Sequence, residues 1–123
     1  MAYDQYLVER IRRIFHDRHT PAEERRMMGG LIFMVDDKMC VAVMGPDLMA
    51  RIGPELYEEA LQREGTSTIG GGEKRRAMTG FVRVEPEAID LDEQLEGWIE
   101  ECIAYNPAAR SSKRKGKRKG KSG

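Results

Sequence analysis

The sequence predicts an α+β protein in which an antiparallel sheet of about four to five strands packs against helices. Short apolar segments at 30–35, 38–44 and 48–52 follow one another with only tight turns between them. Such neighbours pair antiparallel, because parallel strands need long crossover connections. Segments with helical periodicity lie before, between and after the strands. The predicted order is therefore α-β-β-β-α-β(β)-α.

Residues 4–18 predict the first helix. Its apolar residues recur at helical spacing, with charged residues between them: Leu7, Ile11, Ile14 and Phe15. Asp4 suits the N-cap position, because its carboxylate can accept hydrogen bonds from the free amides of the first turn. The residue before Pro21 avoids the helical conformation, so the helix is expected to end before it.

Residues 30–35 and 38–44 predict two central strands joined at Asp36–Asp37, a pair that tolerates the positive φ of a tight turn. Strict alternation assigns Met39, Val41 and Val43 to one face of the second strand and Cys40, Ala42 and Met44 to the other. Apolar side chains therefore lie on both faces of the sheet, and both must be covered. We expect helices on one face and a protein partner, or a second copy of the chain, on the other.

The rest of the globular part follows the same pattern. Pro54 suits the first position of a second helix. Residues 64–77 are rich in Gly, Ser, Thr and charge, which predicts a mobile loop with a short strand near 68–69. A strand at 80–85 ends before Pro86. Asp90, followed three residues later by Glu93, approximates a capping box for a last helix that ends at Asn106–Pro107.

Charge divides the chain into a predicted domain at 1–107 and a disordered basic tail at 108–123. Residues 1–110 contain 14 basic and 21 acidic residues, a net charge of −7. The tail adds seven cations and no acid: Lys113, Arg114, Lys115, Lys117, Arg118, Lys119 and Lys121. Such a segment binds DNA or RNA weakly through phosphates, and without an aromatic residue it is not expected to distinguish bases. Alternatively, it folds back on the acidic body.

Composition also indicates a compartment. No apolar leader and no apolar segment long enough to span a bilayer is visible, so neither a signal peptide nor membrane association is expected. Two cysteines do not form a disulfide framework in a chain of 123 residues. We expect a cytoplasmic protein.

Reactive residue types are present, but their surroundings favour structural roles. Cys40 and Cys102 lie among apolar residues, without the nearby cation or base that a nucleophilic thiol needs. His16 and His19 can share one face of a helix, but zinc needs three or four ligands and no second cluster exists. We therefore expect no catalytic residue, no metal and no cofactor.

Two glycine-rich segments leave an anion-binding alternative open. In the loop after residue 64, Gly71 occupies the position where a P-loop requires lysine, which excludes that motif. Loose anion binding by Lys74, Arg75 and Arg76 remains the alternative to a plain loop. Likewise, Gly29–Gly30 after two arginines is either an anion-binding nest or a turn into the first strand.

Three segments together resemble the TfoX N-terminal domain family over about residues 3–105: RRMMGGLIFMVDDKMCVAV, DLMARIGPELYEEAL and MTGFVRVEPEAIDLDEQLEGWIEECIAY. The residues that carry the family pattern include Arg26, Met27, Gly29, Gly30, Cys40, Arg51 and Gly80. The resemblance implies a small α+β domain with an antiparallel sheet and flanking helices. Full-length members of the TfoX/Sxy type regulate competence genes and carry a second, helical domain. The resemblance supplies no catalytic residues.

These observations predict a non-enzymatic interaction or regulatory module that forms a homodimer or binds another protein. One alternative is a non-specific nucleic-acid-binding protein that acts through its basic tail. A second alternative is a small anion-binding enzyme that uses Arg26, Arg51 or Arg83.

Overall fold

The computed structural model describes residues 3–27, 29–70 and 77–109. Its helices are α1 (Gln5–Asp17), α2 (Pro54–Leu61) and α3 (Asp92–Tyr105), with short 3₁₀ turns η1 (Pro86–Ile89) and η2 (Asn106–Ala108). Its strands are β1 (Glu23–Met27), β2 (Gly30–Val35), β3 (Lys38–Met44), β4 (Asp47–Arg51), β5 (Thr66–Gly70) and β6 (Ala77–Val84). They form one six-stranded antiparallel sheet in the order β1-β2-β3-β4-β6-β5. The α+β prediction is confirmed, with one strand more than the upper expectation.

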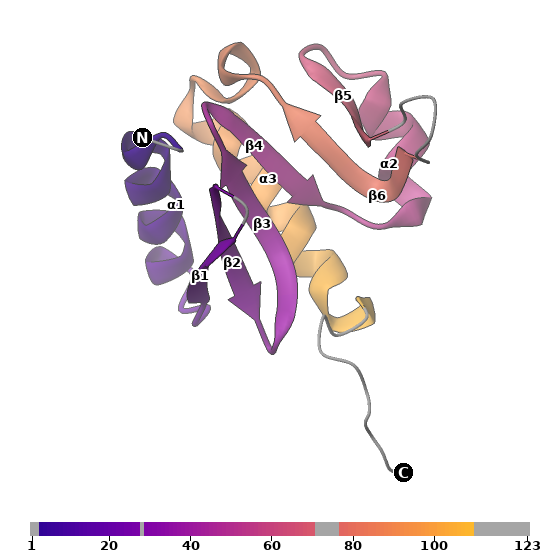
Figure 1. Ribbon diagram of the computed structural model, residues 1–123. Helices are drawn as coiled ribbons and strands as arrows, with labels where there is room; N and C mark the ends of the chain where they lie inside the picture. Colours follow the sequence, from indigo (N-terminus) through magenta and orange to yellow (C-terminus); the bar gives the residue numbers. More distant parts are fainter. Residues whose placement is uncertain (1–2, 28, 71–76, 110–123) are drawn as a thin grey trace, which may run out of the picture.

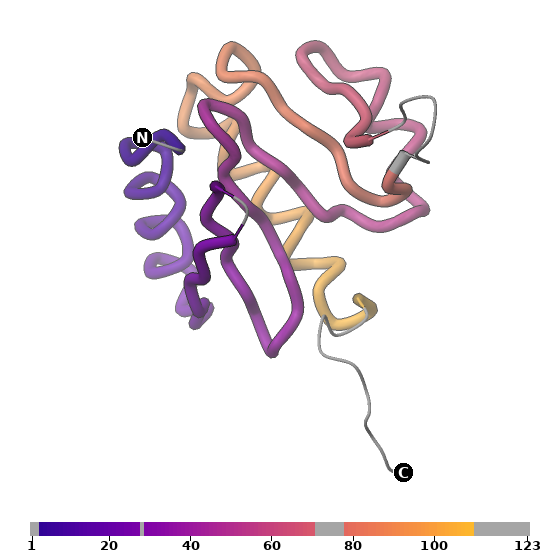
Figure 2. Tube along the Cα trace, in the orientation of Figure 1, coloured from indigo at the N-terminus to yellow at the C-terminus, as the bar shows by residue number. Residues whose placement is uncertain are grey.

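The described helices cover one face of the sheet. Helix α3 crosses behind β3 and β4, α1 lies beside β1 and β2, and α2 lies behind β5 and β6 (Figures 1 and 2). The core lies between these layers and includes Ile11, Leu95 and Ile99 among its buried residues. The ring of Phe15 on α1 stacks on that of Phe33 on β2, with centroids 5.7 Å apart. Burial of such side chains is the main stabilising contribution to the fold.

Strand β1 is the strand that the sequence did not predict. Its sequence, EERRM, contains no apolar alternation, and four of its five residues are exposed. It pairs only with β2, at the edge of the sheet, where charged residues discourage pairing with other chains. The Arg12 guanidinium of α1 donates to both carboxylate oxygens of Glu24, at 2.6 and 2.8 Å, and so connects α1 to this edge.

A β-bulge corrects the predicted faces of β3. The β2–β3 register shifts after Phe33, so that Phe33 pairs with Val41 whereas Met34 pairs with Met39. The extra residue, Cys40, joins Val41 in the core beneath the helices. Met39 consequently lies on the face opposite Val41, contrary to strict alternation, because a bulge sets two residues of one strand against one of its partner.

The hairpin turn and the first two helix starts follow the prediction. Asp36 and Asp37 have φ of 54° and 64°, Asp4 accepts hydrogen bonds from the Tyr6 and Leu7 amides, and α2 begins at Pro54.

The start of α3 differs from the prediction. The N-cap is Leu91, and the side-chain oxygen of Gln94, rather than that of Glu93, accepts from its amide at 2.9 Å. The 3₁₀ turn η1 draws Asp90 into a helical conformation and so delays the cap by one residue.

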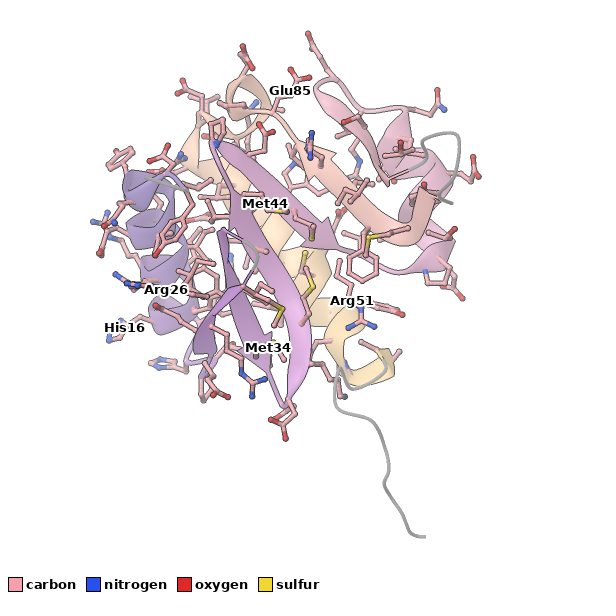
Figure 3. All side chains as sticks on the ribbon, in the orientation of Figure 1. His16, Arg26, Met34, Met44, Arg51 and Glu85 are labelled. Atoms are coloured by element: carbon pink, nitrogen blue, oxygen red, sulfur yellow. The ribbon has the colours of Figure 1, made fainter. Side chains whose placement is uncertain are left out.

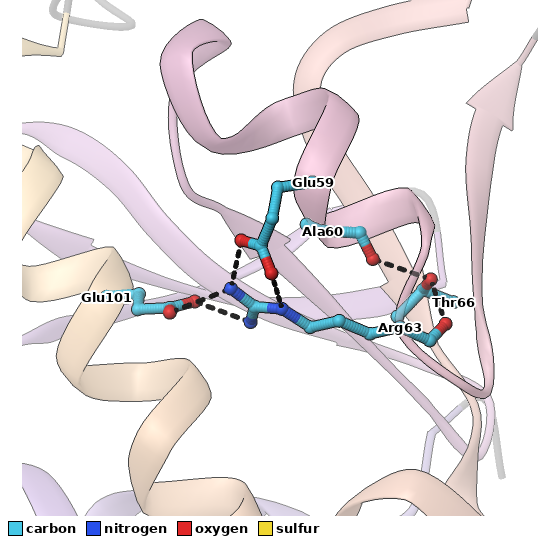
Figure 4. Close-up of polar contacts among 5 residues, drawn as sticks. All are labelled: Glu59, Ala60, Arg63, Thr66 and Glu101. Atoms are coloured by element: carbon cyan, nitrogen blue, oxygen red, sulfur yellow. Dashed lines mark hydrogen bonds and ion pairs between the residues drawn. The ribbon is translucent and has the colours of Figure 1, made fainter.

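Helices α2 and α3 are joined by one arginine (Figure 4). The Arg63 guanidinium, just beyond α2, donates to both carboxylate oxygens of Glu59 and of Glu101, at 2.7 to 3.1 Å. It also lies 4.7 Å from the centre of the Trp98 ring on α3. The Thr66 hydroxyl donates to the Ala60 and Arg63 carbonyl oxygens at 2.9 and 2.7 Å, and so closes the end of α2. Because hydrogen bonds favour its charged form, the pKa of Glu59 is lowered by Arg63.

Candidate interaction surface

The sheet face that the described helices leave uncovered carries a band of methionines. We call it the methionine face and define it by Ile32, Met34, Met39, Ala42, Met44 and Met49. Met34 and Met44 lie on the side of the sheet away from the helices (Figure 3). The other members follow from the strand register, in which Met39 pairs with Met34, and Ala42 pairs with Ile32 and Met49.

Arginines flank the apolar middle of the central row of this face. The register places six residues side by side across the whole sheet: Arg25, Ile32, Ala42, Met49, Arg83 and Ser67. The middle of the row is apolar, and a guanidinium group lies on each side of it. Side chains directly opposite one another in a sheet are in contact range. Arg25 and Arg83 therefore flank an apolar strip in which Ile32 is half-buried and Ala42 and Met49 are 1% and 9% exposed.

Part of this face is shielded although no described helix covers it. Met34, Ala42 and Met49 are only 4%, 1% and 9% exposed, whereas Met39 and Met44 are half-buried. A Cβ on Gly30 would lie 2.7 Å from the Val43 carbonyl oxygen and 3.4 Å from Met44 Cγ. Glycine at position 30 therefore lets Met44 pack close to the neighbouring strand. Unbranched, polarisable methionine side chains adapt readily to a new contact surface.

Charges around the methionine face are mixed in sign. Arg25 forms an ion pair with Glu23 at 3.5 Å, and Arg83 forms one with Asp47 at 3.7 Å. The Arg51 guanidinium donates to the Met39 carbonyl oxygen at 3.3 Å and lies 5.2 Å from the Phe81 ring centre. The apolar band thus has an ion pair near each end, although residues 1–110 carry a net charge of −7. A surface of mixed sign does not repel a copy of itself.

The three arginines suggested for an anion-binding enzyme do not converge. Arg26 pairs with Leu31, whose side chain lies in the core beneath the helices, so Arg26 belongs to that side of the sheet. Arg83 pairs with Met49, and Arg51 is two residues from Met49 on β4, so both lie on the same side of the sheet as the methionine face. A site built from all three would have to span both sides of the sheet.

Both cysteines occupy the core. Cys40 and Cys102 are each 1% exposed and not bonded to one another. Burial raises the pKa of the Cys40 thiol to about 12, although the nearby Arg51 charge acts in the opposite direction. Burial also raises the pKa of Cys102 well above its usual range. Neither thiol is poised as a nucleophile, because the thiolate is the reactive form.

The remaining candidate residues do not assemble a metal or phosphate site. His16 lies in the last turn of α1, 3.6 Å from Asp17, and the described residues contain no group of three or more potential metal ligands. Gly29 has φ of 81° between β1 and β2, as a turn requires, but Arg25 and Arg26 beside it belong to opposite faces of the sheet. The predicted loop lies partly outside the described residues, at 71–76, and its first part forms β5.

The predicted tail at 108–123 lies outside the described part of the chain from residue 110 onward, whereas Ala108 belongs to η2 and Ala109 is buried. None of the helices in the described ranges has the length and apolar content needed to cross a membrane.

The fold is a small α+β domain with helices on one face of its sheet. Its most distinctive feature is the methionine face on the other side, which is apolar and flanked by charged residues. The model of the TfoX N-terminal domain matches residues 14–105, so the chain belongs to that family, as its motifs indicated. No curated protein and no solved structure matches the chain.

One of the family residues has a clear architectural role here. The Gly80 carbonyl accepts hydrogen bonds from the amides of Ile52 and Gly53 at 2.9 and 3.1 Å. With φ of 94°, Gly80 adopts a conformation that other residues rarely enter.

Sequence reasoning predicted apolar side chains on both faces but missed the arrangement of the surface. Arg25 was not assigned to the sheet, because β1 has no strand signature. The row from Arg25 to Arg83 depends on cross-strand register, which one sequence does not reveal. The available signal was the density of methionine between residues 27 and 49.

Proposed function

We propose that this protein is a non-enzymatic interaction and regulatory module that docks a partner through the methionine face. Membership of the TfoX N-terminal domain family supports a module of the competence-regulator type. The observation that carries the proposal is the methionine face, which no described helix covers and on which Ile32, Met39 and Met44 are partly exposed. Contiguous apolar surface rimmed by polar residues is typical of protein interfaces.

The partner that this surface fits directly is a second copy of the chain. In a two-fold dimer the same patch meets itself, so its charges must tolerate their own images. The Glu23–Arg25 and Asp47–Arg83 pairs each contain one acid and one base, and therefore allow opposite charges to face one another across such an axis. Two sheets that pack face to face bury their apolar strands in this way.

Sedimentation equilibrium tests this proposal on three proteins. The wild-type chain is expected to dimerise with rising concentration. Met44→Lys adds a charge to the methionine face and is expected to weaken the dimer at least tenfold, or about 1.4 kcal/mol. Leu91→Lys is the matched control, because Leu91 is 55% exposed and lies on the connection before α3. Equal behaviour of the two variants, or a wild-type monomer throughout, would contradict the proposal.

The second candidate is non-specific binding of nucleic acid through residues 113–121. Its support is the seven cations within those nine residues. If every cation neutralises one phosphate, the logarithm of the affinity for duplex DNA falls with the logarithm of salt concentration with a slope of about −6. Removal of residues 111–123 is expected to abolish this binding. A truncated chain with unchanged affinity would exclude the tail as the binding element.

A further inference from the structure

A groove of about 550 Å³ lies between the start of α2 and the end of α3. Its apolar lining includes Leu56 and Tyr105, and its carboxylates are those of Glu55 and Glu101. Leu56 is 36% exposed, so part of its side chain is accessible in the groove. The groove therefore combines apolar surface, an aromatic ring and negative charge, a combination that suits the long side chains of lysine and arginine.

The helices around this groove carry charge of one sign. Helix α2 contains three acidic residues and α3 contains five, whereas neither contains a lysine or an arginine. Ion pairs with arginines from elsewhere engage Glu59, Asp92, Glu100 and Glu101. No ion pair joins Glu55 to another of the described residues. A cationic segment would meet uncompensated negative charge here.

The chain itself supplies such a segment next to the groove. Ala108 belongs to the lining, and the described chain ends one residue later, at Ala109. Lys113 follows four residues after Ala109, a span of at most about 14 Å. The nine residues 113–121 can extend about 30 Å, more than the roughly 21 Å length of the 14-residue helix α3. A tethered segment also has an effective concentration near the millimolar range.

We propose that residues 113–121 dock in the α2–α3 groove of their own chain and are thereby withheld from polyanions. The groove favours this occupant because the Glu55 carboxylate forms no ion pair with the described residues, whereas the segment carries seven cations, and because Ala108, near the end of the described chain, lines the groove. The docking itself is independent of the proposed nucleic-acid binding. Its effect on affinity for a polyanion rests on that second candidate function. The arm of a second copy is the rival occupant.

Paramagnetic relaxation in the full-length chain tests the docking. A spin label on Ser122→Cys reacts selectively, because Cys40 and Cys102 are buried. At low salt, we expect broadening of the Leu56 and Tyr105 amide signals, and we expect high salt to remove it. Broadening that persists at low salt in the Glu55→Lys variant, or its absence from the wild type, would overturn the proposal. Broadening that arises only between labelled and unlabelled copies would assign the groove to another chain and also overturn it.

A second measurement uses a 20-nucleotide single-stranded DNA as the polyanion. Glu55→Lys and Glu93→Lys change the net charge equally, but Glu93 is exposed in the first turn of α3, whereas the groove lies at the other end of that helix. If the groove sequesters the arm, Glu55→Lys binds the DNA several-fold more tightly than Glu93→Lys. Equal affinities would overturn the competition. If neither variant binds DNA while the broadening is present, the docking stands and the nucleic-acid function fails.

Discussion

The connection between α2 and α3 makes Arg63→Ala the most informative perturbation of stability. The substitution removes the ion pair with Glu101, whose partners are each about 30% exposed, and the stacking of the guanidinium on Trp98 at 4.7 Å. A partly exposed bidentate pair contributes up to about 1 kcal/mol, and a cation–π contact contributes about 1 kcal/mol. The Arg63–Glu59 ion pair contributes little to the free energy of unfolding, because Glu59 is exposed and solvent screens the pair. We expect a loss of about 2 kcal/mol in the free energy of unfolding.

Urea denaturation followed by tryptophan fluorescence measures this loss directly, because Trp98 is the only tryptophan in the chain. Thermal unfolding should show a Tm lower by about 10 °C, since about 1 kcal/mol corresponds to roughly 5 °C in a domain of this size. Arg63→Met retains the aliphatic stem and separates packing from charge. A double-mutant cycle with Glu101→Gln isolates the ion pair.

Arg12→Ala is the matched control for this prediction. Arg12 also pairs with two glutamates, Glu9 and Glu24, but its side chain is 45% exposed. Arg12→Ala should therefore lower the free energy of unfolding by less than Arg63→Ala does. An Arg63→Ala variant within about 0.5 kcal/mol of the wild type, the range of ordinary surface changes, would refute the proposed connection.

Three further predictions concern the two cysteines, the Arg12–Glu24 pair and two glycines. Ellman's reagent should modify the thiols of Cys40 and Cys102 in the native protein no faster than the protein unfolds, because both are buried and burial raises their pKa values; rapid modification would contradict this. The hydrogen bond from Arg12 lowers the pKa of the Glu24 carboxyl below its ordinary value of 4.5. The Arg12–Glu24 pair therefore stabilises the fold fully above about pH 4.5, and this contribution is lost as the pH falls through the lower pKa of the folded state. Acid titration of unfolding should show this loss, and Arg12→Ala should remove it. Gly53→Ala should destabilise the fold by at least about 1 kcal/mol, because Gly53 has φ of 92° and a Cβ there would lie 2.5 Å from the Tyr105 ring. Gly97→Ala should instead stabilise the fold by about 0.5 kcal/mol, because a Cβ at this position of α3 would meet open space.

Local signals were sufficient for most of the fold. Helical spacing located α1 and α3, Asp36–Asp37 marked the central hairpin, and Pro54 marked the start of α2. Each of these features depends on residues close in sequence. The family motifs likewise led to the correct family.

Long-range pairing explains what was missed. Strand β1 forms because β2 and Arg12 hold a charged segment in place, and no residue in the segment EERRM predicts this pairing. The bulge at Cys40 depends on the pairing of Met39 with Met34, which reassigns side chains between faces. The methionine face combines both features, so its composition was foreseeable but its geometry was not.

Methyl NMR of the methionine side chains tests the proposed interface most directly, since four of the eight methionines belong to the methionine face. With rising protein concentration, an interface on the methionine face predicts chemical-shift changes concentrated at Met34, Met39, Met44 and Met49, with a midpoint equal to that of dimerisation by sedimentation. Shifts that map elsewhere while the chain dimerises, or methyl signals that stay unchanged at every concentration, would contradict it.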